Sequence, residues 1–340
     1  AAEPDSLEFW LEYAHLAARR ARISVRREAV LQCHDWSTAL AGAAARRLLA
    51  QPLVFNVHLP QRHSQPRAME NIGLMAADLV IVNSRAVRDE IRARNLPIRR
   101  IEVVPNGVDA DLFRPAETWP AHGNYILYAG RLVPQKGVDV LLRAFAVLLR
   151  RLDCRLVVAG DGLLDLYLRR LTRYLGVPDR VSFRHWQTGP ALVKMFQNAA
   201  AVAVPSLYEP FGIVALEAMA CARAPVASKT GGLAEVVEHG VDGYLVEPGD
   251  HLDFARRLLW LLNDPELSRR MGEAARRKAQ TYSWESAARQ TGALYRDVRY
   301  SGEHWLATSE GRSAMDLLYQ TFDEEHRQML AETIGTGVEI

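Results

Sequence analysis

Cysteine, long apolar runs and blocks of like charge are all scarce in this sequence of 340 residues, and each scarcity excludes a class of protein. The cysteines are Cys33, Cys154 and Cys221, whose wide spacing suits neither a disulfide framework nor a zinc site. No uncharged apolar run reaches the ~18 residues of a membrane-spanning helix. The first residues do not follow the pattern of a secretory signal. We therefore expect buried thiols in a cytoplasmic protein.

The charged residues are balanced and dispersed along the chain. The formal net charge is only +2, and no single-sign run is long enough to predict an arm that binds nucleic acid. Hydrophobic residues make up 49% of the chain and charged residues 24%, as in ordinary globular proteins. A length of 340 residues exceeds what one hydrophobic core usually supports, so two domains are expected. The partners should be small or neutral molecules, and nothing in the pattern indicates an oligomeric state.

Hydrophobic periodicity in the first third of the chain alternates between short strands and helices. A helix is predicted over Leu7–Arg22, ahead of the first strand. The alternation that follows predicts a parallel sheet with helices on both faces. The expected strands are Ala29–Cys33, Leu53–Val57, Asp78–Val82 and Ile101–Val104, and the expected helices are Thr38–Leu49, Ala68–Ala76 and Ala86–Arg94.

Turn-forming residues interrupt this pattern between Pro105 and Pro115, where we expect a domain boundary. A second alternating set then predicts a second parallel sheet, with strands Tyr125–Tyr128, Arg155–Ala159, Val181–Arg184, Ala201–Val204, Pro225–Ser228 and Tyr244–Val246. The helices expected after it are Asp250–Leu262, Pro265–Gln280 and Trp284–Val298, and Ala314–Ile334 also has helical spacing. The expected division of the chain is therefore 1–115, 116–282 and 283–340.

The segment Glu209–Glu217, with the sequence EPFGIVALE, places two carboxylates on either side of a glycine turn. Ile213–Ala220 is predicted as a helix, so the positive end of its dipole and its first free N–H groups follow Gly212 and can bind an anion. Glu209 precedes the turn, where it can meet a neutral polyol. Glu217 can accept hydrogen bonds from vicinal hydroxyls. The segment thus predicts a site for phosphate, sugar and ribose together.

These residues resemble the signature of glycosyltransferase family 4, the retaining nucleotide-sugar enzymes that include the bacterial glycogen synthases. The resemblance extends from about Leu31 to about Val298 and includes further motifs in the family's order. They are Ala129–Gly137 (AGRLVPQKG), Ala159–Gly162 (AGDG), Pro225–Ser228 (PVAS), Gly231–Glu235 (GGLAE) and Pro248–Asp250 (PGD). The resemblance implies the GT-B fold, an α/β architecture of two Rossmann-like parallel-sheet domains that face each other across a cleft. The donor would be held mainly by the second domain, at the carboxyl ends of its strands.

The resemblance also implies roles for single residues. Glu209 would position the sugar hydroxyls and Glu217 would hold the ribose. The groups expected to bind the donor diphosphate are the side chains of Arg131 and Lys136 and the backbone at Gly130, Gly212, Ile213 and Val214. Lys136 is the more informative cation, because only four of the 42 basic residues are lysine. Two cations would neutralise the departing β-phosphate without a metal ion, so no cofactor or metal is expected.

The first domain resembles the family over two segments. Leu31–Leu40 (LQCHDWSTAL) and Phe55–His58 (FNVH) are similar to the histidine-bearing strand ends of glycogen and starch synthases. His34 would then contact the sugar, and His58 would be a second donor contact. Alternatively, each histidine only satisfies a carbonyl group at a strand end.

The beginning of the first domain departs from the family's pattern. Family members carry further strands before Leu31, opening with a glycine-rich loop that approaches the donor. We therefore expect a truncated first domain in a fragment, a processed product or a divergent form. The exposed edge beside the first strand needs a cover, which the helix Leu7–Arg22 could partly provide.

Three patterns imitate other kinds of site. Asp109-Ala110-Asp111 is similar to a metal-binding triplet, but we expect it to cap the turn after the boundary. Gly160-Asp161-Gly162 begins like a dinucleotide fingerprint, but Asp165 stands where the third glycine should be, which argues against a nicotinamide cofactor. The arginine-rich helix at the N-terminus could lie on an anionic membrane, but packing on its own sheet is favoured.

The expected activity is that of a retaining hexosyltransferase. It would move a sugar, glucose in particular, from a nucleoside-diphosphate sugar to an acceptor hydroxyl, and His34-Asp35-Trp36 favours an α-glucan as acceptor. A second hypothesis is a nucleotide-sugar-binding module without turnover, because the glycine-rich loop is missing. A third is an NAD-dependent oxidoreductase, which the broken fingerprint disfavours. The nucleotide base, the sugar and the acceptor stay open at this level.

Overall fold

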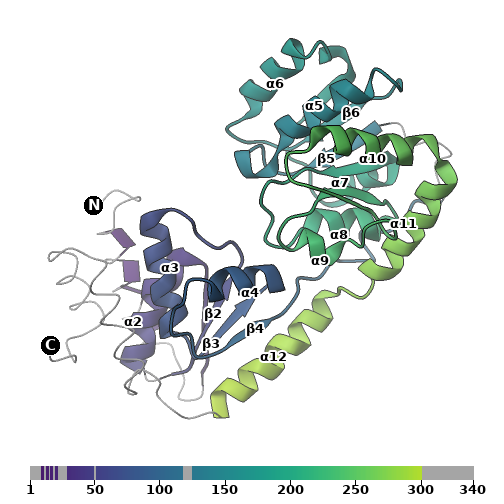
Figure 1. Ribbon diagram of the computed structural model, residues 1–340. Coiled ribbons are helices and arrows are strands. Elements are labelled where there is room, and N and C mark those ends of the chain that lie inside the picture. The colour runs from purple at the N-terminus through teal and green to yellow at the C-terminus, as the bar shows by residue number, and fades with distance from the viewer. Residues whose placement is uncertain are drawn as a thin grey trace. The chain divides into compact units, whose positions relative to one another are not determined.

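The computed structural model describes residues 29–49, 51–117 and 125–300, together with the residue pairs 9–10, 13–14, 16–17 and 20–21. The chain divides into two compact units, one comprising 1–104 and 288–340 and the other comprising 105–287 (Figure 1). Each unit contains one sheet, and all recorded pairs between its named strands are parallel. Among the described residues, no helix is long and apolar enough to cross a membrane.

The first unit has a four-stranded sheet in the order β1-β2-β3-β4. Its strands are β1 (Leu31–His34), β2 (Leu53–Val57), β3 (Leu79–Val82) and β4 (Ile101–Val103), and its helices between the strands are α2 (Ala39–Leu49), α3 (Ser64–Ala76) and α4 (Arg85–Arg92). All residues of β2 and β3 are buried, as expected for strands covered on both faces. The four predicted strands are confirmed to within one or two residues.

All three helix starts in this unit differ from the predictions, that of α4 by one residue. The helix predicted from Ala68 begins at Ser64, because Pro66 lies in the first turn, where a missing N–H group breaks no helical hydrogen bond. The helix predicted from Thr38 is preceded by a 3-10 turn, Trp36–Thr38, and becomes α-helical at Ala39.

The described residues of the predicted helix Leu7–Arg22 are helical. The Trp10 and Trp36 rings pack with their centroids 4.9 Å apart, and Ala14 is fully buried in the core of the first unit. Ala21 and Leu31, the first residue of β1, both pack against the buried pair Ala44 and Ala45 of α2. These contacts confirm that the described part of this helix packs on its own unit, whereas its cover of the edge beside the first strand stays a prediction.

The second unit has a six-stranded sheet in the order β10-β9-β8-β5-β6-β7. Its strands are β5 (Tyr125–Ala129), β6 (Leu156–Ala159), β7 (Val181–Arg184), β8 (Ala199–Val204), β9 (Pro225–Ser228) and β10 (Tyr244–Val246). All six predicted strands are confirmed. Residues of β5 alternate between two cores, with Ile126 and Tyr128 in one and Leu127 and Ala129 in the other.

Helices cover both faces of this sheet (Figure 1). The core on one face includes residues of α5 (Val138–Leu148), α6 (Asp165–Tyr174) and α10 (His251–Asn263), and the core on the other includes residues of α7 (Gly189–Asn198), α8 (Ile213–Ala220) and α9 (Leu233–Val236). The predicted helices after the sheet are confirmed as α10, α11 (Pro265–Ala279) and α12 (Trp284–Tyr300). Asp250 and Asp264 cap α10 and α11 by accepting hydrogen bonds from backbone N–H groups. The helical spacing at 314–334 lies outside the described residues.

The strand order determines where this unit can bind a ligand. From β5 the chain proceeds outward through β6 and β7, then returns to place β8 on the other side of β5. The loops that leave the carboxyl ends of β5 and β8 therefore diverge and leave a crevice between them, the usual ligand site of such sheets. These two loops contain Gly130–Lys136 and Glu209–Gly212, which are the strongest motifs of the sequence.

Candidate functional site

The loop after β5 is held in place by the loop after β6. The N–H group of Gly130 donates to the carbonyl oxygen of Ala159 at 3.0 Å, and that of Leu132 donates to Asp161 at 2.9 Å. Gly160 has φ +150°, and a Cβ atom there would lie 1.9 Å from the carbonyl oxygen of Gly130. Glycine is thus required for the two loops to approach. The loop presents Arg131 with its side chain exposed.

Lys136 and Glu209 form an ion pair across the crevice between β5 and β8. The Nζ atom of Lys136 lies 2.6 Å from Oε2 of Glu209, and both side chains are largely buried. Ser206 Oγ donates to the same carboxylate oxygen at 3.0 Å. The backbone N–H of Leu207 also donates to the carbonyl of Gln135, which ties the two loops together. Two predicted catalytic residues are therefore brought together.

The glycine turn between Glu209 and α8 depends on the motif Gly231–Glu235. Gly232 donates its N–H to the carbonyl of Glu209 at 3.0 Å, and a Cβ atom on Gly231 would lie 2.0 Å from that oxygen. Gly212 has φ +105° and begins α8, so the first N–H groups of the helix, at Ile213 and Val214, have no partner within the helix. The helix N-terminus at which an anion site is predicted is therefore present, and anion binding there stays a prediction.

A cavity of about 350 Å³ opens beside the start of α8. Its size is at the small end of the range for ligand sites. Among its lining residues are Gly130, Ile213, Val214 and Glu217, four of the residues predicted to bind the donor. Ile213 and Glu217 are one helical turn apart, so they share one face of α8. Burial raises the pKa of Glu217 to about 7.

The other wall of the cavity was missed by the sequence interpretation. It is formed by Leu112, Phe113 and the segment 186–189 with Leu192. Asp161 holds this segment, because its Oδ2 accepts the N–H of Trp186 at 2.8 Å and its Oδ1 lies 2.9 Å from Nδ1 of His185. These two contacts lower the pKa of Asp161, the bond from Trp186 most of all. This wall could have been predicted from the rule that ligands bind at the carboxyl ends of strands, because Trp186 follows β7.

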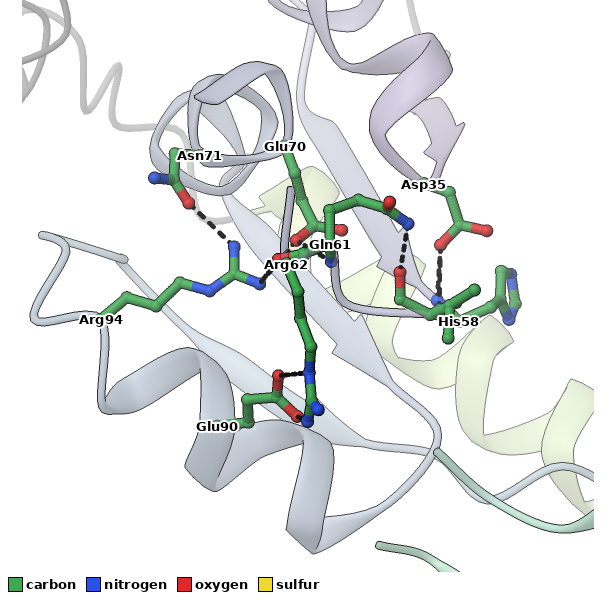
Figure 2. Close-up of polar contacts among 9 residues, drawn as sticks. Asp35, His58, Gln61, Arg62, Glu70, Asn71, Glu90 and Arg94 are labelled. Atoms are coloured by element: carbon green, nitrogen blue, oxygen red, sulfur yellow. Dashed lines mark hydrogen bonds and ion pairs between the residues drawn. The ribbon is translucent and has the colours of Figure 1, made fainter. Parts of the chain in front are cut away.

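The two predicted histidines of the first unit are paired with each other. Nδ1 of His34 lies 2.9 Å from Nε2 of His58, and the rings stack with an interplanar angle of 2°. Asp35 has φ +55°, and its Oδ1 accepts the N–H groups of His58 at 2.7 Å and Leu59 at 3.3 Å (Figure 2). Burial lowers the pKa of His34, and His58 acts in the same direction. The ring partner of His34 Nδ1 is thus a histidine and not a strand-end carbonyl.

The remaining polar candidates have structural roles. Asp109 Oδ1 accepts the N–H groups of Asp111 and Leu112 at 3.1 and 2.9 Å, so the acidic triplet caps its turn as predicted. Across the described ranges, no group of three or more His, Cys, Asp or Glu side chains is placed to hold a metal ion. All three thiols are free, and Cys221 is buried as expected, whereas Cys33 and Cys154 are only partly buried.

Comparison with known families identifies the chain. The model of the family "Glycosyl transferases group 1" matches residues 109–278, and that of "Glycosyltransferase Family 4" matches residues 4–112. The chain is also 32% identical over 291 residues to an uncharacterized glycosyltransferase of Methanocaldococcus jannaschii. The aligned region covers 78% of this chain and 75% of that protein. This chain belongs to glycosyltransferase family 4.

Relatives named as D-inositol 3-phosphate glycosyltransferases are similar to this glycosyltransferase over most of its length. The D-inositol 3-phosphate glycosyltransferase of Streptomyces avermitilis is 35% identical over 299 residues, covering 78% of this chain and 64% of that protein. The glycosyltransferase thus spans slightly less than two thirds of that relative.

Solved structures confirm the predicted fold. Sucrose-phosphate synthase from Thermosynechococcus elongatus matches with a TM-score of 0.79 and 26% identity, covering 88% of this chain and 80% of that one. Anabaena HepE in complex with UDP and glucose matches with a TM-score of 0.73 and 25% identity, covering 83% and 81%. With its two parallel-sheet α/β units, the glycosyltransferase has the GT-B fold.

Proposed function

We propose that this glycosyltransferase is a retaining hexosyltransferase that moves glucose from UDP-glucose to an acceptor hydroxyl. The observation that carries the proposal is the Lys136–Glu209 pair, at 2.6 Å, in the crevice between β5 and β8. It places a cation and a hydroxyl-binding carboxylate next to the first N–H groups of α8. HepE, whose structure contains UDP and glucose, supports uridine and glucose as the donor components.

The proposed chemistry follows from where charge develops. Breaking the anomeric bond leaves negative charge on the β-phosphate and positive charge on the sugar ring. Lys136, Arg131 and the N–H groups of Ile213 and Val214 would stabilise the phosphate. Glu209 would accept hydrogen bonds from the sugar hydroxyls, because its carboxylate has lone pairs beyond those that contact Lys136. In a retaining reaction, the acceptor arrives on the face that the phosphate leaves, and a phosphate oxygen takes the acceptor's proton.

The cavity beside α8 would hold the nucleoside. Glu217 would accept hydrogen bonds from both ribose hydroxyls, because a carboxylate has enough lone pairs for two donors. The wall formed by Trp186 and its neighbours would contact the base, since an exposed indole offers a flat apolar surface. His34 would contact the sugar from the first unit, and His58, paired with it, would be a second donor contact.

Two acceptors are supported by different observations. The His34-Asp35-Trp36 neighbourhood favours an α-glucan, as in the glycogen synthases that the sequence resembles. The similarity to D-inositol 3-phosphate glycosyltransferases favours a phosphorylated polyol. With either acceptor, the new bond is made to a hydroxyl group. We propose that the reaction takes place in the cytoplasm.

The test is product analysis with defined donors and acceptors. The protein is incubated with UDP-glucose or ADP-glucose and with glycogen, D-inositol 3-phosphate or no acceptor, while nucleoside diphosphate release is measured. We expect UDP release that needs an acceptor, and an α-linked product by NMR. A β-linked product would contradict retention, and binding without release would favour the module that lacks turnover. An excess of EDTA should leave the rate unchanged, because the proposed charge stabilisation uses Arg131 and Lys136 instead of a metal ion.

A further inference from the structure

The segment 58–62, which follows β2 and carries His58, is held by side chains from three directions (Figure 2). Asp35 binds its first two N–H groups, as described above. Arg62, at its end, pairs with Glu90 of α4 at 3.3 Å. Between them, Gln61 Nε2 donates to the carbonyl of Leu59 at 2.8 Å. A loop of five residues with this many ties has little freedom to move.

Besides Asp35 and Glu90, a buried ion pair between Glu70 and Arg94 holds the segment 58–62. Glu70 of α3 has a fully buried side chain, and its Oε2 lies 2.7 Å from the guanidinium of Arg94, whose side chain is only 4% exposed. The same Oε2 accepts the N–H of Gln61 at 3.0 Å, and Arg94 donates to the carbonyl of Gln61 at 3.3 Å. Both backbone polar groups of Gln61 are therefore bound by one ion pair. If the loop moved, two buried charges would lose a partner each, which is strongly unfavourable.

We propose that Glu70 and Arg94 are positioning residues of the sugar-transfer reaction. By binding both backbone groups of Gln61, they keep Nε2 of His58 at 2.9 Å from Nδ1 of His34. Neither residue needs to touch a substrate for this role. Fixing the position of His58 would increase the rate of sugar transfer, because a displacement of about 1 Å in a group that contacts the reacting sugar can lower the rate about a hundredfold. The role in catalysis rests on the proposed function, whereas the effect on the histidine pair does not.

The matched variants are Glu70→Gln and Asp78→Asn. Glu70→Gln keeps the shape of the side chain and an oxygen for Gln61 but removes the charge that faces Arg94. Asp78 provides the control because it forms a comparable buried pair with Arg46 at 2.7 Å and also binds a backbone N–H of β2. That N–H belongs to Leu53, at the opposite end of the strand from His58. Both variants therefore remove one buried carboxylate charge in the same unit. Asp78→Asn removes it from two arginines, because Arg99 also lies 3.0 Å from Asp78, but only Glu70→Gln touches the loop.

The first readout is the ¹⁵N spectrum of the imidazole rings in the whole chain, with signals assigned by His34→Asn and His58→Asn. We expect Glu70→Gln to shift the signals of both His34 and His58, and Asp78→Asn to leave them as in the parent. Unchanged histidine signals in a folded Glu70→Gln protein would overturn the proposal, whether or not the chain transfers sugar. Equal shifts in both variants would also overturn it, because they would indicate general loosening of the unit.

The second readout is a double-mutant cycle on turnover. Glu70→Gln should lower kcat about tenfold and change the KM for UDP-glucose much less, since the second unit is proposed to bind the nucleoside and the diphosphate. In a His58→Ala background the same substitution should have no further effect, because the residue through which it acts is gone. Additive losses would overturn the proposed route through His58. A parent chain without turnover would instead refute the proposed function, and the spectra would still decide the inference.

Discussion

The Nζ atom of Lys136 lies 2.6 Å from Oε2 of Glu209, although 73 residues separate them in the chain. The contact exists because β5 and β8 are neighbours in the sheet, so their loops end in the same crevice. A Cβ atom on Gly212 would lie 3.8 Å from Cγ of Glu209, which places the carboxylate beside the start of α8 as well. The pair therefore connects the two loops and the helix terminus that would surround a diphosphate.

Replacing Lys136 by alanine should lower kcat by at least about two orders of magnitude, the usual effect of losing one preorganised charge. The substitution removes a cation proposed to stabilise the β-phosphate and leaves Glu209 without its ion-pair partner. The measurement is the initial rate of UDP release at saturating UDP-glucose. Lys194→Ala, which removes an exposed lysine on α7, is the control and should retain the parent rate. Equal activity of the two variants would remove Lys136 from the mechanism.

Gly160→Ala should disrupt the contact between the loops after β5 and β6, in the proposed donor site, without removing any polar group. The added Cβ would lie 1.9 Å from the carbonyl oxygen of Gly130, and a clash between backbone atoms cannot be relieved by a rotamer change. We expect a loss of more than about 2 kcal/mol in the free energy of unfolding and much weaker UDP binding. Urea denaturation and calorimetry measure the two effects.

Gly176→Ala is the matched control for that substitution. Gly176 also has a positive φ, +73°, but no heavy atom lies within 4 Å of an added Cβ. Only the backbone strain remains, so the loss should be about 1 kcal/mol with unchanged UDP affinity. If the two variants behave alike, the contact between the loops at Gly130 and Gly160 is unimportant.

Most of the fold could be predicted because its strands are buried and parallel. A strand covered on both faces is a nearly continuous apolar run, and the buried strands Leu53–Val57 and Pro225–Ser228 were predicted with the bounds that the structure shows. The start of α3 was missed for the opposite reason, since Ser64–Arg67 is polar and contains a proline. Its helical state follows from the chain after it, which packs into the core.

The part of the site that was predicted lies in local motifs, and the part that was missed depends on contacts distant in sequence. Gly160-Asp161-Gly162 was interpreted as part of a family motif and as an incomplete dinucleotide fingerprint, without a contact for either Gly160 or Asp161. In the structure Gly160 admits the backbone of Gly130, and Asp161 binds the N–H of Trp186, 25 residues later. The Glu70–Arg94 pair is equally invisible in the sequence, because Glu70 lies in α3 whereas Arg94 follows the end of α4. Such contacts follow from topology and not from spacing.

Nucleotide-sugar binding should become tighter as the pH rises through about 7, the pKa to which burial raises Glu217. The ionised carboxylate accepts stronger hydrogen bonds from the ribose hydroxyls than the protonated form does. UDP-glucose suits the titration because its diphosphate has no proton to lose in this range. Calorimetry of the parent and of Glu217→Gln at about pH 6 and about pH 8 should show a pH-dependent affinity only in the parent. A parallel pH dependence in both would refute the ribose role.

The ligand-free protein should show the opposite trend in stability. Because the folded state raises the pKa of Glu217, the folded chain retains the proton better than the unfolded chain does. The free energy of unfolding should therefore decrease as the pH rises from about 5 to about 8, as Glu217 ionises at a buried position. Glu217→Gln should remove this decrease. A decrease that persists unchanged in the variant would assign it to another group.

Arg276 of α11 should stabilise the wall of the cavity more than any exposed arginine of that helix. Its guanidinium donates to the carbonyls of Phe113 at 2.8 Å, Ala220 at 2.7 Å and Ala110 at 2.9 Å, which ties the turn before β5 to the end of α8. Arg276→Met leaves these three acceptors without a donor, so the free energy of unfolding should fall by about 2–4 kcal/mol. UDP should also bind more weakly, because Phe113 lines the cavity. Arg277→Met changes the exposed neighbour and should cost less than about 0.5 kcal/mol in urea denaturation. Similar losses from both substitutions would show that the three carbonyl contacts contribute little.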